Sequence, residues 1–191
     1  YISNYSSGKQ GYEIAKQLML TGAKVTLISG PTKLQPPSNI KIINIKTANE
    51  MYDAARKIKF DVAIFTAAVV DKKPSEFSYK KIKKKNFNKI LLKNNPDIIK
   101  EISIKNKNKY IIGFAAETNN IINNAKRKLL EKNCDLIVLN NIDKNNVFDS
   151  EYNKVTLISK KNIKKFKRMT KTNVAKILVN QVIEKIYSKK N

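Results

Sequence analysis

Hydrophobic positions follow two alternating patterns along the chain. Compact apolar runs rich in β-branched residues occur at residues 23–29, 40–45, 61–68, 109–116 and 135–139. Each run is typical of a strand, and residues 61–68 are apolar enough to predict a fully buried one. Residues 11–21 and 172–187 instead have the apolar spacing of amphipathic helices. The alternation predicts one α/β domain over residues 1–191, with a mainly parallel sheet and helices on both faces.

Short-range signals define where several elements start and stop. Thr47 and Glu50, three residues apart, form a capping box for the helix that follows the second strand. Gly22 is placed to end the first helix. Asn95 and Pro96 have the residue types of an N-cap and a first helical position. The remaining predicted elements are a short strand at residues 90–92, a helix from Thr118 or Asn119 to Lys132, and an extended segment or hairpin at residues 147–158.

The start of the pattern differs from that of a usual doubly wound sheet. Such a sheet begins with a strand that leads through a glycine-rich turn into a helix. Here only residues 1–11 precede the first helix, and Gly8 and Gly11 alone are a weak signal. We therefore expect a Rossmann-like doubly wound sheet whose first strand is encoded upstream of Tyr1.

The chain is strongly basic, with 39 Lys and Arg against 15 Asp and Glu and a formal net charge of +24. Only three of the 39 are arginine, namely Arg56, Arg127 and Arg168. Abundant Lys, Asn and Ile beside scarce Gly and Pro indicate A/T-rich codons, which explain much of the charge. Proteins that read nucleic acids favour the bidentate fork of arginine, so we expect no specific nucleic-acid partner.

Two absences limit the possible chemistry. The sequence has no histidine, which excludes an imidazole base, a Ser-His-Asp triad and an HExxH metal site. Cys134 is the single cysteine, so there is no intrachain disulfide, and we expect a buried structural thiol.

No apolar run approaches the roughly 20 residues of a membrane-spanning helix. We expect a cytoplasmic protein without a membrane partner.

Polar residues gather before the first helix and after the strand at residues 61–68. Residues 3–9 combine serines, Gly8 and Lys9 with the free amides of a helix start. They form either an anion cradle or an ordinary capped helix start. Asp71 follows the strand at the edge where α/β sheets bind ligands. It is placed to contact a ribose, a base or a metal, or simply to cap its loop.

Other candidates come from a long polar stretch and from one helix. Residues 70–88 contain the lysine run 80–85 and form either a mobile lid or a solvated face. Phe114, near the end of a strand, either stacks on a base or belongs to the core. Lys128 and Lys132, four residues apart on one helix face, can both reach one phosphate chain.

Five motifs in order resemble one enzyme family. They are residues 1–9 (YISNYSSGK), 67–71 (AAVVD), 81–84 (KIKK), 95–98 (NPDI) and 113–118 (GFAAET). Together they resemble the bacterial phosphopantothenate–cysteine ligases, which commonly form the C-terminal half of a bifunctional coenzyme A biosynthesis protein. The resemblance covers residues 1 to about 187, although the family's upstream strand and flavin-dependent half are not in this sequence.

The resemblance implies a Rossmann-like homodimer that uses CTP with Mg²⁺ or Mn²⁺. The implied substrates are 4'-phosphopantothenate and L-cysteine, joined through an acyl-cytidylate with release of pyrophosphate and CMP. FMN is implied only for a decarboxylase domain fused upstream. Activation and positioning carry such chemistry, so it needs no histidine.

The resemblance also implies roles for individual residues. Asn4, Ala68 and Lys81 match positions that act in catalysis, with Lys81 in the lid. The implied phosphopantothenate site is Asn4, Ser6, Ser7, Gly8 and Lys9. The implied CTP site is Phe65, Thr66, Ala67, Asp71, Lys81, Pro96, Asp97, Ile98, Ile99, Phe114, Lys128 and Lys132. No metal ligand is assigned.

Two other classes compete with the ligase. An NAD-type oxidoreductase would share the fold, but the sequence lacks its GxGxxG fingerprint. A basic Rossmann-like nucleotide- or nucleic-acid-binding module without ligase activity would explain the charge. It would predict a salt-sensitive affinity for DNA or RNA.

Overall fold

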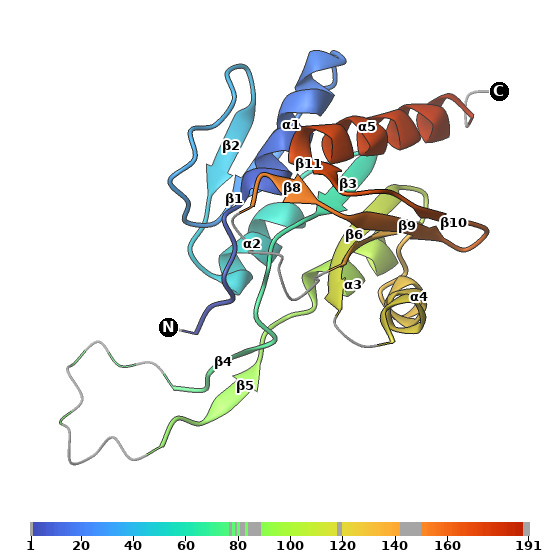
Figure 1. Cartoon of the computed structure of the whole chain (residues 1–191). Helices are drawn as coiled ribbons and strands as arrows, with labels where there is room; N and C mark the ends of the chain where they lie inside the picture. Colours follow the sequence, from blue (N-terminus) through green and yellow to red (C-terminus); the bar gives the residue numbers. More distant parts are fainter. Residues whose placement is uncertain are drawn as a thin grey trace.

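The computed structural model describes residues 2–76, 78, 80, 83, 89–117, 120–141 and 150–188. These residues form an α/β fold around a five-stranded sheet with the strand order β10-β9-β7-β6-β3 (Figure 1). The sheet strands are β3 (Val62–Phe65), β6 (Tyr110–Glu117), β7 (Leu136–Asn141), β9 (Val155–Ser159) and β10 (Ile163–Lys165). The helices are α1 (Lys9–Leu20), α2 (Ala48–Ala55), α3 (Ile98–Lys105), α4 (Ile121–Glu131) and α5 (Lys171–Tyr187). The α/β class is confirmed.

The five-stranded sheet is mixed. β3, β6 and β7 are parallel to one another, β9 is antiparallel to β7, and β10 is antiparallel to β9. A separate parallel pair is formed by β1 (Thr26–Ser29) and β2 (Lys41–Asn44). β8 (Tyr152–Asn153) pairs with β11 (Met169–Thr170) beside the start of α5. The predicted extended segment at residues 147–158 therefore overlaps β8 and β9, while its residues 147–149 lie outside the described part of the chain. The short strands β10 and β11 were not predicted.

The prediction of a fully buried strand at residues 61–68 is wrong. β3 spans only Val62–Phe65, and all four residues are half-buried. The reason lies in the strand order: β3 is the last strand of the five, and it pairs only with β6 in the described part of the chain. The residues that follow, 66–71, form a loop rather than the end of the strand.

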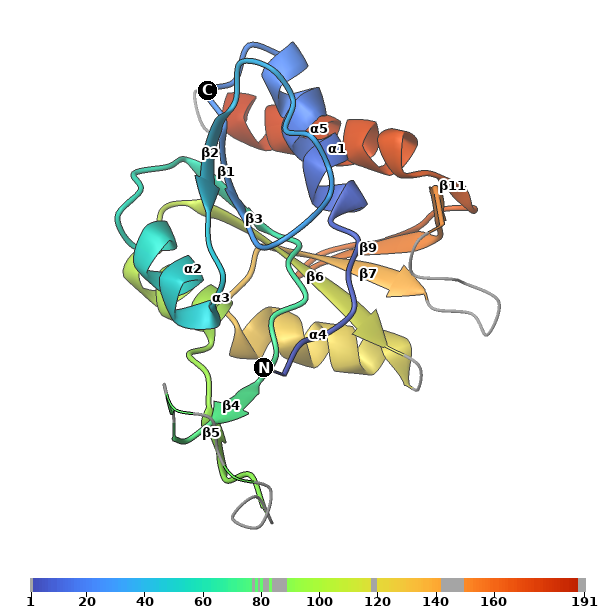
Figure 2. The same cartoon turned by 90° about the vertical axis from the view of Figure 1, so that its left-hand side faces the viewer.

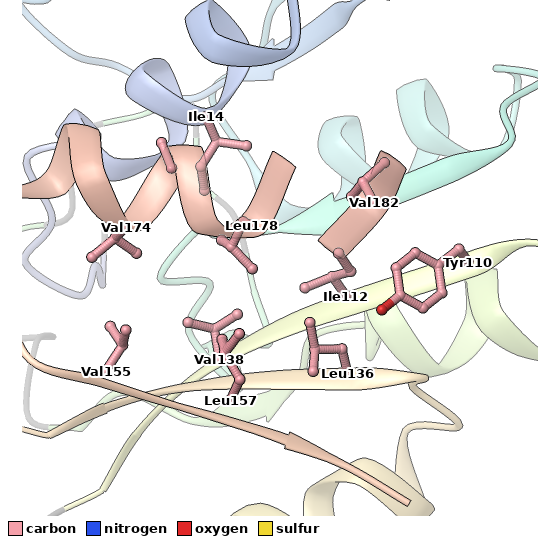
Figure 3. Close-up of a cluster of buried hydrophobic side chains, with 11 residues drawn as sticks. Ile14, Tyr110, Ile112, Leu136, Val138, Val155, Leu157, Val174, Leu178 and Val182 are labelled. Carbon is pink, nitrogen blue, oxygen red and sulfur yellow. The ribbon is translucent and has the colours of Figure 1, made fainter. Parts of the chain in front are cut away.

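Helices cover both faces of the sheet, as the sequence predicts. α1 and α5 lie together on one face, and α4 lies on the other (Figures 1 and 2). Figure 3 shows the core under α1 and α5, where Ile14 and Leu178 point toward Ile112, Val138 and neighbouring strand residues. A second core under α4 includes Ala125, Leu129, Cys134, Ile137 and Leu139.

The stretch predicted to be a lid loop begins in a hairpin strand. β4 (Lys72–Pro74) pairs antiparallel with β5 (Leu92–Asn94), and together they form an arm that projects from the body (Figures 1 and 2). The prediction of a long loop without secondary structure over residues 70–88 is therefore wrong at its start, where β4 forms. The predicted strand at residues 90–92 is displaced to β5.

Two helix starts test the capping predictions. At α2 the Thr47 hydroxyl accepts a hydrogen bond from the Glu50 amide at 3.1 Å, and the Glu50 carboxylate accepts from the Lys46 amide at 2.9 Å. The capping box is confirmed, with its return bond one residue earlier than usual. At α3 the prediction is wrong, because Asp97 rather than Asn95 is the N-cap. No described helix is long and apolar enough to span a bilayer.

Candidate functional site

The candidate site lies where the parallel strands end. Because β3, β6 and β7 run in one direction, the loop at residues 66–71 and the end of β6 share one edge of the sheet. The first turn of α1 approaches the same edge. A Cβ atom added to Gly11 would lie 2.6 Å from Thr66 Oγ1, so only glycine allows this approach without a shift of Thr66. The predicted α1 and β3 motifs are thus brought together.

Asn4 contacts this loop directly. Its Nδ2 donates to the carbonyl oxygen of Val69 at 3.3 Å, and the N-terminal segment runs beside the chain that joins β3 to β4 (Figure 2). Ala67, Ala68 and Asp71 in the same loop are exposed. The predicted catalytic residues Asn4 and Ala68 therefore lie on one accessible surface.

The start of α1 has a glycine N-cap. Gly8 has a φ of 76°, and no side chain caps the helix. The Ser6 hydroxyl accepts a weak bond from the Gly8 amide at 3.4 Å, and the Ser7 carbonyl accepts one from the Thr32 hydroxyl at 3.3 Å. Lys9 forms an ion pair with Glu151 at 2.6 Å. The alternative of an ordinary helix start capped by a side chain is therefore wrong in the described part of the chain. The anion cradle stays a prediction.

A groove of about 430 Å³ runs along α1 toward Met19 and Leu34. Of the predicted site residues that the structure describes, only Lys9 lines it. The groove is therefore adjacent to the candidate site rather than its centre.

Two predicted nucleotide-binding residues are paired with each other. The Asp97 carboxylate accepts from the Lys100 amide at 3.2 Å and thereby caps α3. It also forms an ion pair with Lys132 at 3.2 Å. Lys132 is the C-cap of α4, so the pair connects two helices. Lys128 lies one turn earlier on α4 and is half-buried.

Several predicted CTP-binding residues have their side chains in the core. Ile98 is 5% exposed, whereas Phe65 and Ile99 pack against the core under α4. Phe114 packs against the opposite core, under α1 and α5, and is half-buried. The backbone at Phe65, Ile98 and Ile99 is therefore the part that can face a nucleotide, and base stacking by Phe114 stays a prediction. Pro96 is half-buried beside them.

Lys81 lies outside the described residues, as do Thr118 and Asn119. The proposed lid role of the lysine run is therefore a prediction. Its described members, Lys80 and Lys83, are exposed.

Cys134 is a structural thiol. It is 2% exposed in the core under α4, and burial raises the pKa of its thiol to about 12. A thiol with that pKa is protonated at neutral pH and is a poor nucleophile. This bears out the expectation from the sequence.

Sequence reasoning missed the main role of Asn95. Its amide Nδ2 donates to the carbonyl of Val70 at 2.9 Å instead of capping a helix. The Asn-Pro pair is equally typical of a cap and of an extended turn. Short-range pattern alone does not separate these two roles.

No group of three or more Asp, Glu or Cys side chains is placed to hold a metal ion in the described part of the chain. Mg²⁺ usually binds through one or two carboxylates together with substrate phosphates and water. Asp71, exposed in the loop after β3, fits a site of that kind. Asp97 fits it less well, because its carboxylate already caps α3 and pairs with Lys132.

The fold is that of a Rossmann-like α/β domain, and the loops at its strand ends form the candidate ligand-binding edge. Residues 1–186 match the family described as DNA/pantothenate metabolism flavoprotein C-terminal domain, and the chain belongs to this family. It is 46% identical over 182 residues to the coenzyme A biosynthesis bifunctional protein CoaBC of Borreliella burgdorferi, covering 92% of this chain and 46% of that protein. The chain spans about half the length of the curated relatives that it matches.

A solved structure agrees with this assignment, and a more distant one shares the fold. The crystal structure of the C-terminal domain of CoaBC superposes with a TM-score of 0.83 at 34% identity, covering 98% of this chain and 87% of that one. A Cab2 mutant in complex with phosphopantothenate-cysteine superposes with a TM-score of 0.76, covering 100% of this chain and 82% of the other. At 14% identity, that second likeness shows the fold alone.

Proposed function

We propose that residues 1–191 form a CTP-dependent ligase domain that joins 4'-phosphopantothenate to L-cysteine in coenzyme A biosynthesis. The products are 4'-phosphopantothenoylcysteine, CMP and pyrophosphate. One observation carries the proposal: Asn4, from the N-terminal motif, contacts the Ala67–Asp71 motif at Val69. Two motifs far apart in sequence thus meet at the edge where this fold binds ligands.

The reaction has two steps. The pantothenate carboxylate first attacks the α-phosphorus of CTP, which forms a P–O bond and releases pyrophosphate. The cysteine amine then attacks the acyl carbonyl, which forms the amide and releases CMP. Both steps depend on orienting the reactants and stabilising charge. Lysines, amides and backbone groups supply these functions without histidine.

The residues divide between the two substrates. In this proposal Asn4 and Ala68 would hold the acyl-cytidylate, and the serines before α1 with Lys9 would hold the phosphate of phosphopantothenate. The proposed nucleotide site uses the Asp71 and Phe114 side chains, the backbone around Phe65 to Ala67 and Pro96 to Ile99, and the lysines Lys81, Lys128 and Lys132. Mg²⁺ or Mn²⁺ would bind mainly through the triphosphate, which the metal would polarise.

The assembly is also a proposal. Ile90, Leu91 and Leu92 on the arm are 53%, 57% and 49% exposed, and such an apolar run suits a second copy of the chain. This supports a homodimer. Relatives about twice as long support fusion to a decarboxylase domain, where FMN would bind. A cytoplasmic location is proposed for the whole protein.

The test is CMP release by the full-length protein with CTP, 4'-phosphopantothenate and cysteine. We expect activity in the parent and none in Asn4→Asp, because the carboxylate loses the amide donor and repels the substrate carboxylate. Normal turnover by Asn4→Asp would reject the role of Asn4. Thermal stabilisation by NAD or by an oligonucleotide, but not by CTP, would favour the rival classes.

A further inference from the structure

Three successive backbone carbonyls in the loop after β3 are held by two asparagines. Val69 O accepts from Asn4 Nδ2 at 3.3 Å, and Val70 O accepts from Asn95 Nδ2 at 2.9 Å. Asp71 O accepts from the Asn95 backbone amide at 2.8 Å. The loop that carries Ala67, Ala68 and Asp71 is thus tied both to the N-terminal segment and to the segment that enters α3.

Asn95 occupies the base of the arm. The β4–β5 ladder pairs Lys72 with Asn94, so the bond from the Asn95 amide to Asp71 O continues it by one step. The Asn95 side chain donates its own hydrogen bond to Val70, the residue that precedes Asp71. Its side chain is half-buried, whereas that of its neighbour Asn94 is exposed.

The residues after Asn95 restrict its backbone. Pro96 disfavours a helical conformation for the residue before it and fixes its own φ. Asp97 then caps α3 and pairs with Lys132. A shift of Asn95 would therefore move the strand-end loop and the α3 start relative to each other.

We propose that Asn95 is a positioning residue for the ligase reaction, a role that rests on the proposed function. By holding Val70 and Asp71, it fixes the loop with Ala68 and Asp71 against the α3 start with Asp97. The chemistry requires a neutral amide: Nδ2 must donate to a carbonyl oxygen, and a carboxylate oxygen there would repel it. Asn95 need not touch either substrate.

Asn95→Asp tests this with the matched control Asn94→Asp. Asn94 Oδ1 accepts from Lys72 Nζ at 2.6 Å, an interaction that a carboxylate keeps. Both variants are made in the full-length protein. Three quantities are measured: kcat and KM for CMP release, and the hydrogen-exchange rates of the amides in residues 66–72.

For Asn95→Asp we expect kcat to fall about a hundredfold, the scale of a displacement of about 1 Å. Loop amides should exchange roughly tenfold faster, because a hydrogen bond that restrains them is lost. Asn94→Asp should leave both quantities within about threefold of the parent.

Two results would overturn the proposal. Equal behaviour of the two variants would show that the Asn95 amide holds nothing. Faster exchange with an unchanged kcat would make Asn95 only a structural clamp. A parent protein that releases no CMP would instead reject the proposed function, and the exchange rates would still show whether Asn95 holds the loop.

Discussion

At the residue scale, Asp97 stabilises the fold at a position that the family resemblance gives to CTP. Its carboxylate, 41% exposed, caps α3 and pairs with Lys132, itself 28% exposed. Partly exposed ion pairs contribute about 0–1 kcal/mol, and N-caps about 0.5–2 kcal/mol. The cap is therefore the larger contribution, and Lys132 is available to exchange its partner for a phosphate at little cost in stability.

Substitutions at the two residues should separate these roles. Asp97→Ala should lower the free energy of unfolding by about 1–2 kcal/mol, because it removes the cap as well as the pair. Lys132→Gln should lower it by less than about 1 kcal/mol and should weaken CTP binding. Urea unfolding and calorimetric titration with CTP measure the two effects. Unchanged CTP affinity in Lys132→Gln would leave Lys132 a purely structural residue.

The lysine run gives a sharper residue-scale contrast. Seven lysines lie between residues 72 and 85, so pure surface electrostatics would make each nearly redundant. A lysine that closes on the nucleotide instead acts where water is excluded. Lys81→Gln should therefore lower turnover at least roughly a hundredfold, the scale of losing one preorganised donor. Lys85→Gln should cost less than about threefold. Equal effects in a CMP-release assay would mean that the run is only a solvated basic face.

At the scale of elements, the contact between α1 and the loop after β3 decides where the site forms. Alanine is favoured over glycine inside a helix by about 1 kcal/mol. The contact opposes this preference, since a Cβ atom at Gly11 would meet Thr66 Oγ1 at 2.6 Å. The close approach, rather than helix propensity, explains a glycine at this position.

A double-mutant cycle at Gly11 and Thr66 should separate the crowding against Thr66 from the gain in helix propensity. Gly11→Ala alone should destabilise the protein by about 1–2 kcal/mol through crowding. In a Thr66→Ala background the same change should instead stabilise by about 0.5–1 kcal/mol through helix propensity. Chemical unfolding of the four proteins gives the coupling. A coupling near zero would show that Thr66 rotates away without cost.

Element-scale features divide clearly into those that could be predicted and those that could not. The α2 capping box depends on neighbours in sequence and was predicted. Gly22 was predicted as the C-cap of α1, but Thr21 is the C-cap and Gly22, with a φ of 83°, is the residue after it. The half-burial of β3 depends on which strands pair, and the α3 cap depends on a contact between Asn95 and Val70, 25 residues apart. For the candidate site, motif resemblance supplied the residues. Only the structure separates exposed Asp71 from core-facing Ile98.

At the scale of the whole molecule, a buried thiol and a buried phenol make the stability of the fold depend on pH in the alkaline range. Burial raises the pKa of Cys134 from 9.0, and that of Tyr110 from 10.0, to about 12 in each case. When the pH exceeds the pKa values that these two groups have in the unfolded chain, the unfolded chain releases protons that the folded protein retains. Stability should therefore fall as pH rises from about 9 toward 12.

Cys134→Ala tests the thiol's share of this dependence. The variant should lose stability less steeply, by at most about 1.4 kcal/mol per pH unit, because one titrating group is gone. Urea unfolding at several pH values between about 8 and 10.5 measures the slope. Identical slopes in parent and variant would contradict the shift assigned to Cys134.

In the proposed homodimer, two copies of the chain would contact each other through the arm. In a two-fold interface each residue occurs twice, so a substitution counts twice. Burying one leucine contributes about 1.5–3 kcal/mol. Leu91→Lys should therefore weaken a dimer of this chain by about 3–6 kcal/mol, or roughly a hundredfold to ten-thousandfold in dissociation constant. Leu130→Lys is the matched control, because Leu130 is 66% exposed on α4, away from the arm. In sedimentation velocity the parent and the control should be dimers and Leu91→Lys a monomer. A dimeric Leu91→Lys would place the interface elsewhere, and a monomeric parent would reject the homodimer itself.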